Sequence, residues 1–276
     1  MSKQLKLGYY LGRLLFIIIT IIYVFPVLWL VLISLKQEAE IFSALPTIFF
    51  SPTWLHYSNL FNHETKFLDY LWNSLVVSVS GTLLALLCGT MAGYACARFK
   101  LKVTRGFMLA LLILRIIPAI AIVVPIYIFA NRLGLLDQYS TLILVDVCVV
   151  LPLVTILAQN FILEVPVEIE EAAKLDGCNS WQIFWRITLP NALGGITALG
   201  IFSFILCWNE FIFALVLTGR HTTTLPIGIM SFFGDKVTQW GEVAAMGMVM
   251  MFPAAILTLV VQKYMVTGFG TGALKE

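Results

Sequence analysis

Long apolar runs follow one another along almost the whole chain and determine its predicted fold. A helix that crosses a membrane needs about 20 predominantly apolar residues, and a run of 18 or more with few charges is a candidate. Six segments meet this condition: residues 14–35, 71–97, 106–130, 139–158, 195–217 and 243–262. The pattern therefore predicts an all-α, polytopic membrane protein with six transmembrane helices.

The composition agrees with this pattern. Hydrophobic residues make up 60% and charged residues 12% of the chain, and the mean hydropathy is +0.96, whereas soluble domains have roughly 45–50% apolar and about 25% charged residues. The apolar runs leave no stretch for a soluble domain, so we expect a single membrane domain over residues 1–276. A net charge of +2 does not indicate nucleic-acid binding. The five cysteines are far apart without a Cys-x-x-Cys pair, so we expect free thiols.

The first apolar run is expected to be a retained helix. Residues 14–35 are 22 consecutive uncharged residues, which is longer than the apolar core of about 7–15 residues in a signal peptide. No pair of small residues suited to cleavage follows the run.

The distribution of Lys and Arg predicts the orientation, because these residues are retained on the cytoplasmic side. If the N-terminus is cytoplasmic, the inner segments hold 11 Lys and Arg residues and the outer segments hold 5. We therefore expect both termini to be cytoplasmic, with residues 36–70 forming a longer outer loop.

The segment between the fourth and fifth spans, residues 159–190, is predicted to form two short helices. Pro166 suits the first turn of a helix, the acidic residues after it lie near the positive helix end, and Gly177 suits a C-terminal cap. Asn179 or Ser180 then caps a second helix. Such an amphipathic segment can lie on the bilayer, but its excess of acidic residues favours a protein partner over an anionic membrane surface.

This loop also resembles a known family. The string EAA at residues 171–173, Gly177 four residues later and the closing Ile187-x-Leu189-Pro190 resemble the cytoplasmic loop of ABC importer permeases. The string WNEF at residues 208–211 and the glycine-rich tail are similar to the maltose-type carbohydrate permeases, a likeness that extends over essentially the whole chain.

The resemblance implies a permease subunit of a bacterial cell-membrane importer for a carbohydrate, with residues 159–190 as a loop that carries a coupling helix. Its partners would be a second permease subunit, two ATPase subunits that bind ATP and Mg²⁺, and an extracytoplasmic solute-binding protein. The coupling helix would enter a cleft of the ATPase. The docking residues implied are Glu170, Glu171, Ala172, Ala173, Leu175, Asp176 and Gly177.

The tail is a less close match. The family's tail reaches between the ATPase subunits, which implies contacts for Gly270, Thr271 and Gly272. Here Phe269-Gly270-Thr271 stands where the family usually has Leu-Thr-Ala, and the chain closes in Glu276.

Other chemistry is not indicated. The tail glycines lack the Gly-Lys-Ser/Thr of a phosphate-binding loop, so ATP hydrolysis is assigned to another subunit and the chain is expected not to be an enzyme. We expect no cofactor bound by this chain. The three histidines, His56, His63 and His221, lack paired ligand spacing for a metal and are expected in loops exposed to water.

Ionisable residues within spans are costly and mark functional candidates. Here they are Arg115, Asp146 and Glu210. Pairing of Arg115 with a carboxylate of a neighbouring helix is an equally good explanation, and Pro118 and Pro125 are expected to break the third span. Trp208, Asn209 and Glu210 offer a ring and polar groups suited to a sugar, but such residues also join helices.

Two other functions are compatible with the residues alone. An ion-coupled secondary transporter would use Asp146 and Glu210 as proton sites, and a membrane scaffold or enzyme subunit would move no substrate. The sequence leaves the identity of the sugar open.

Overall fold

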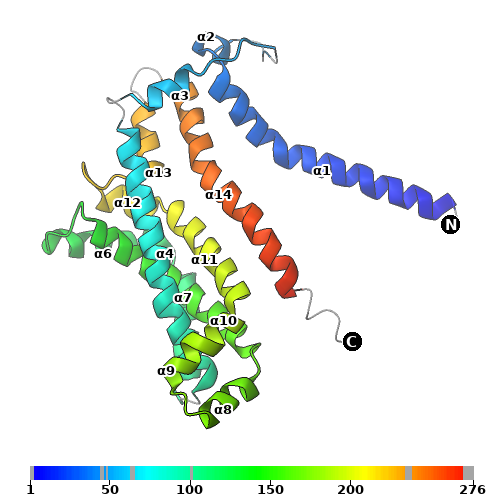
Figure 1. The fold of residues 1–276 in the computed structure, drawn as a ribbon. Coiled ribbons are helices and arrows are strands. Elements are labelled where there is room, and N and C mark those ends of the chain that lie inside the picture. Colours follow the sequence, from blue (N-terminus) through cyan, green and yellow to red (C-terminus); the bar gives the residue numbers. More distant parts are fainter. Residues whose placement is uncertain are drawn as a thin grey trace. The chain divides into compact units, whose positions relative to one another are not determined.

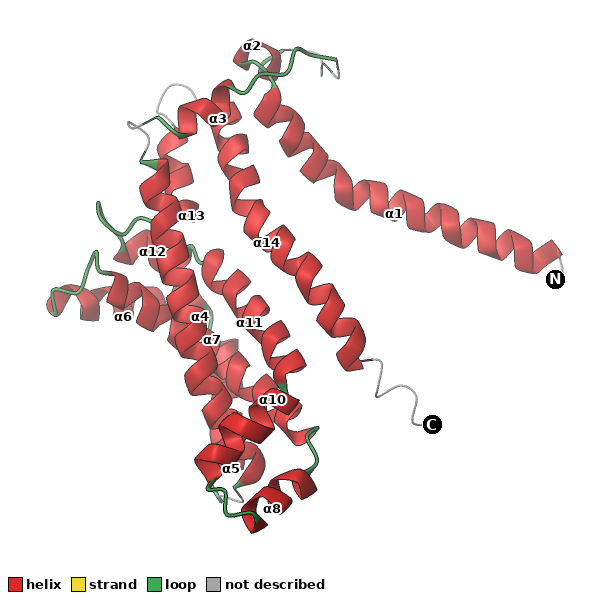
Figure 2. Cartoon of the chain, in the orientation of Figure 1, coloured by secondary structure: helices red, strands yellow, loops and turns green. Residues whose placement is uncertain are grey.

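A computed structural model describes residues 3–43, 47, 49–62, 66–99, 102–233 and 238–269. Four residues named in the predictions lie outside these ranges: His63, Gly270, Thr271 and Gly272. Figure 2 shows helices joined by loops. The β-pairing within the described residues is a single isolated bridge between Phe233 and Thr238. The predicted all-α class is therefore confirmed.

Four helices are long and apolar enough to cross a membrane: α1 (Lys3–Leu35), α4 (Phe67–Arg98), α7 (Tyr139–Leu163) and α14 (Trp240–Phe269). Two bent helix pairs also have a suitable length and composition, which gives up to six candidate spans among the described residues. One pair is α5 (Thr104–Ile116) with α6 (Ala119–Arg132), bent by 95°, and the other joins residues 180–191 to α11 (Leu193–Trp208), bent by 82°.

Two of the predicted spans are interrupted. The span expected over 106–130 breaks at Pro118, as predicted: α5 ends at Ile116, Ile117 is extended and Pro118 precedes the next helix, because a residue before proline avoids the helical region. The break expected at Pro125 is wrong, since Pro125 lies inside α6. The span expected over 195–217 ends at Trp208 and resumes as α12 (Ile212–Leu217).

The chain packs as two compact units, residues 1–67 with 229–252 and residues 68–228 with 253–276. The first contains α1 and the short elements α2 (Glu38–Ile41), α3 (Leu55–Leu60) and η3 (Ile229–Phe232), with the first half of α14. None of the most apolar window of α1 is buried within the chain. An apolar helix surface of this kind is suited to lipid contact.

In the first unit, a buried polar cluster holds the segment after α1. His56 is 3% exposed; its Nε2 lies 2.7 Å from the carbonyl oxygen of Lys36 and its Nδ1 lies 3.1 Å from Glu242 Oε1. Asn59 donates to the same Glu242 oxygen at 2.8 Å. The prediction of a water-exposed His56 is therefore wrong, because α3 packs this side chain beside the first turn of α14.

The core of the second unit is formed by α4, α7 and α11, which lie side by side (Figure 1). Gly89 and Gly93 allow α4 to approach α7 closely. A Cβ atom at Gly93 would lie only 2.9 Å from the backbone nitrogen of Gln159 and 3.0 Å from the carbonyl oxygen of Thr155. This Gly-x-x-x-Gly spacing is typical of close helix contacts in membranes, where small residues let backbones meet.

Asp137 joins the turn before α7 to the segment after α12. Its carboxylate accepts hydrogen bonds from the backbone nitrogens of Gly219, Thr222 and the exposed His221, and from the Thr222 hydroxyl. Partial burial by itself would raise the pKa of Asp137, but the hydrogen bonds from Thr222, His221 and Gly219 lower it below its usual value. The start of α7 and the end of α12 are therefore held together by an ionised side chain.

The close contact at Gly93 generates a stability prediction. Gly93→Ala forces a methyl group against the backbone of α7, and we expect a loss of about 1–3 kcal/mol in the free energy of unfolding. Gly194→Ala is the matched control, since a Cβ atom there meets nothing within 4 Å. Thermal unfolding of the purified chain in detergent measures both. Equal behaviour of the two variants would show that the α4–α7 approach is not constrained at Gly93.

Candidate functional site

The 159–190 loop begins with α8 (Val167–Leu175), which is preceded by Pro166 at the N-cap. Gly177 has a φ of +89°, a conformation that glycine adopts without a steric cost. Its nitrogen donates to the carbonyl oxygen of Lys174 at 3.1 Å, and the nitrogen of Cys178 donates to that of Ala173 at 3.0 Å. These two bonds form a Schellman motif, so the predicted cap at Gly177 is confirmed.

The second helical segment of the loop begins directly after the turn that ends α8. The Asn179 side chain accepts from the backbone nitrogen of Gln182, and the Gln182 side chain accepts from the nitrogen of Asn179. This reciprocal capping box starts a helical segment over residues 180–191, made of α9 (Ser180–Ile183), the π-helical turn η2 (Phe184–Thr188) and α10 (Leu189–Asn191). Of the two predicted caps, Asn179 is the one used, and the expected pair of short helices is confirmed.

A buried ion pair attaches this loop to the spanning helices. Glu170, on α8, is 1% exposed, and its Oε1 accepts from Arg98 Nε at 2.8 Å. The Thr188 hydroxyl donates to the same oxygen at 2.7 Å, and the Tyr94 hydroxyl donates to Oε2 at 3.4 Å. Residues of α4, α8 and η2 therefore converge on one carboxylate.

The same guanidinium also binds the end of α7. Arg98 Nη2 donates to the carbonyl oxygens of Ile162 and Val165 at 2.8 and 2.7 Å. These carbonyls lie at a helix C-terminus, where backbone oxygens lack helical partners and a positive charge is favourable. The last residue of α4 thus fixes both the end of α7 and the start of the loop.

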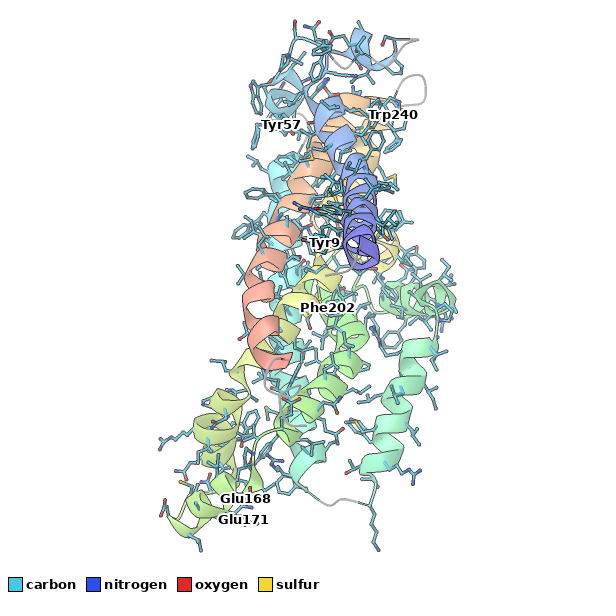
Figure 3. All side chains as sticks on the ribbon, turned by 90° about the vertical axis from the view of Figure 1, so that its right-hand side faces the viewer. Tyr9, Tyr57, Glu168, Glu171, Phe202 and Trp240 are labelled. Atoms are coloured by element: carbon cyan, nitrogen blue, oxygen red, sulfur yellow. The ribbon has the colours of Figure 1, made fainter. Side chains whose placement is uncertain are left out.

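The predicted docking residues separate into two groups. Glu170 and Ala173 are buried within the chain and so do not belong to an exposed face. The exposed members are Glu171, Ala172, Leu175, Asp176 and Gly177. Leu175 has 90% of its surface exposed. In Figure 3, Glu168 and Glu171 lie together at the outer end of this loop.

The ionisable candidates within the spans lie in two different places. Asp146, Trp208 and Glu210 line one enclosed cavity of about 10 Å³, the size of one water molecule. The Glu210 carboxylate accepts from the backbone nitrogens of Phe213 and Ala214 at 2.8 and 2.9 Å. It therefore caps α12 at the break in the predicted fifth span, where a negative charge suits the positive helix end.

The remaining candidates lie elsewhere. Trp208 is 1% exposed, and its ring stacks on Phe204 with centroids 5.6 Å apart; this packing agrees with the alternative that such a residue joins helices. Asn209 is exposed and donates to the carbonyl oxygen of Ile205. Arg115 is exposed, forms no ion pair within the described chain and lines a separate groove of about 450 Å³.

The sequence of this chain is similar to those of known proteins. Residues 85–270 match the family described as binding-protein-dependent transport system inner membrane component. The chain is 36% identical over 265 residues to the probable ABC transporter permease protein y4oR of Sinorhizobium fredii, covering 96% of this chain and 95% of the relative. It is 30% identical over 262 residues to the trehalose/maltose transport system permease protein MalG of Thermococcus litoralis, covering 94% of each.

A solved structure gives the same result for the fold. A chain of a bacterial ABC transporter involved in the import of the acidic polysaccharide alginate matches with a TM-score of 0.82 and 20% sequence identity. The match covers 96% of this chain and 98% of the solved one. The two chains therefore share one fold.

The Arg98–Glu170 pair predicts an asymmetric mutational response. Glu170→Met leaves the Arg98 charge buried without its partner, so we expect a loss of about 3–5 kcal/mol in the free energy of unfolding. The double variant Arg98→Met with Glu170→Met leaves no buried charge and should lose less. Glu171→Met, at an exposed neighbour, is the control. Chemical or thermal unfolding measures all three, and a double variant that is worse than Glu170→Met contradicts the assignment.

Proposed function

Since the chain belongs to the family of binding-protein-dependent transport system inner membrane components, we propose that it is a permease subunit through which an ABC importer moves a carbohydrate. The observation that carries the proposal is the 159–190 loop, which is capped at both of its helices and tied to α4 and α7 by Arg98 and Glu170. The carbohydrate is supported by the trehalose/maltose relative.

The geometry explains how such a loop passes on a movement. A partner that closes on ATP moves as a rigid body, and only an element that is fixed to the spans carries this movement to them. Arg98 and Glu170 provide that fixation, while Glu171, Ala172, Leu175 and the turn at Gly177 provide the exposed docking face. Glu170 is thus a positioning residue for the ATPase interface.

The other components follow from this proposal. A second permease subunit completes the pathway, two separate ATPase subunits bind ATP and Mg²⁺, and an extracytoplasmic protein delivers the solute. This chain binds no nucleotide itself. The excess of Lys and Arg in alternate connecting segments supports a cytoplasmic position for both termini and the 159–190 loop, the side on which an ATPase meets its ATP. The tail residues Gly270, Thr271 and Gly272 remain proposed contacts to the ATPase.

The five candidates for the translocation path differ in their exposure. Asn209 and Arg115 are exposed, so their polar groups can meet a hydroxylated solute. Asp146, Trp208 and Glu210 line a common small cavity and remain candidates there.

A mutation in the docking face should weaken binding to the ATPase without unfolding the chain. Leu175→Asp places a charge on the most exposed apolar side chain of α8, and we expect ATPase copurification to weaken at least tenfold, as for truncation of a central interface residue. Leu133→Asp is the matched control, because Leu133 is 56% exposed at the C-cap of α6, outside the 159–190 loop. Unchanged copurification of the Leu175 variant, with a normal unfolding temperature, rejects the docking face.

The transport function is tested in liposomes that contain the assembled importer. Uptake of radiolabelled trehalose, maltose or another sugar bound by the cognate binding protein should require internal ATP and should persist with a protonophore. Uptake that needs no ATPase subunit and collapses with the protonophore would instead show an ion-coupled transporter. A fully assembled complex that moves none of the sugars its binding protein holds would contradict the carbohydrate assignment.

A further inference from the structure

The described part of the chain contains an open groove between the last turns of α4 and the start of α5. It has a volume of about 580 Å³. Ala92, Ala95 and Cys96 of α4 form one wall, and Val103, Gly106 and Phe107 form the other. Because Arg98 of α4 binds Glu170, the groove lies at the same end of the second unit as the 159–190 loop.

The rim of this groove is positively charged. Lys102 lines it, and Arg105, on the first turn of α5, is exposed beside it. Neither forms an ion pair with another described residue. The sequence from Tyr70 to Leu136 contains no Asp or Glu, so α4 and α5 supply no carboxylate after Asp69 to neutralise the rim, and Glu170 is already bound to Arg98.

The rim also contains a hydroxyl group that forms no hydrogen bond within the described residues. Thr104 lines the groove, and its hydroxyl oxygen is buried without a hydrogen-bond partner among the described residues. No side chain caps α5, and its first turn contains no acidic residue. The groove thus joins an apolar trough to a rim that offers positive charge and hydrogen-bond donors.

We propose that this groove binds an anionic phospholipid, with one acyl chain along the wall formed by Ala92, Ala95 and Phe107 and the phosphate at Lys102, Thr104 and Arg105. Basic pockets between transmembrane helices near the membrane surface suit anionic head groups. A soluble anion would use the rim alone and leave the apolar trough uncovered. A second protein chain would have to match the positive rim with carboxylates of its own.

The purified full chain, in nanodiscs of phosphatidylcholine with increasing phosphatidylglycerol, provides the test. Native mass spectrometry after release into detergent counts the retained lipids. We expect phosphatidylglycerol to be retained in preference to phosphatidylcholine. The double variant Lys102→Gln with Arg105→Gln should weaken retention by about fivefold for each charge. The control pair Arg132→Gln with Arg220→Gln, two exposed charges outside the groove, should not.

Two further measurements distinguish the other occupants. Ala95→Trp fills the trough and should abolish the preference, whereas glycerol phosphate at millimolar concentration should not displace the lipid. Equal retention of the two lipids, or equal loss in the control pair, overturns the proposal. Displacement by glycerol phosphate identifies a soluble phosphate site instead. An Ala95→Trp variant that retains phosphatidylglycerol but no longer copurifies with the second permease identifies a protein interface. None of these results depends on transport or on the ATPase.

Discussion

The carboxylate of Glu170 and the guanidinium of Arg98 are both removed from water, and the attachment of the 159–190 loop to the helical bundle depends on them. Burial of two charges is costly unless every remaining donor and acceptor is used. Here the guanidinium also binds two carbonyls at the end of α7, and the carboxylate also accepts from Thr188 and Tyr94. These contacts attach α8 to the ends of α4 and α7.

Hydrogen bonds within the loop also hold its shape. The Schellman motif at Gly177 and the capping box at Asn179 satisfy the free backbone groups on both sides of the turn. As a result, the turn between α8 and α9 needs no partner to keep its shape. The side chains that point away from the bundle, above all Leu175, are left for an interface.

Breaks in the spans follow the same requirement that backbone groups be satisfied where water is scarce. At the end of α11, the chain leaves the helical conformation around Asn209, and the Glu210 carboxylate takes the backbone nitrogens that open at the start of α12. At Ile117 the bend has a different cause, since the following proline excludes the helical conformation. One polar side chain and one proline thus set the positions where two predicted spans are interrupted.

Local rules predicted much of this molecule. The six apolar runs, the proline break at Pro118, the cap at Gly177 and the two short helices of the 159–190 loop all depend on neighbours in sequence, and all are found in the structure. The Gly-x-x-x-Gly spacing at Gly89 and Gly93 was also readable, although our predictions did not use it. The family resemblance, which rests on the same loop, agrees with the matched family.

The structure alone decided which side chains of these elements face protein and which remain exposed. Glu170 and Glu171 are adjacent acidic residues in one helix, yet the first is buried against Arg98, 72 residues away, and the second is exposed. His56 and Trp208 are likewise covered by segments distant in sequence or by a neighbouring ring. The sequence determined the helices and their caps because these are short-range effects of backbone conformation and hydrophobic pattern. The partners of Arg98 and His56 depended on tertiary packing, because pairing between distant residues leaves no periodic pattern along the chain.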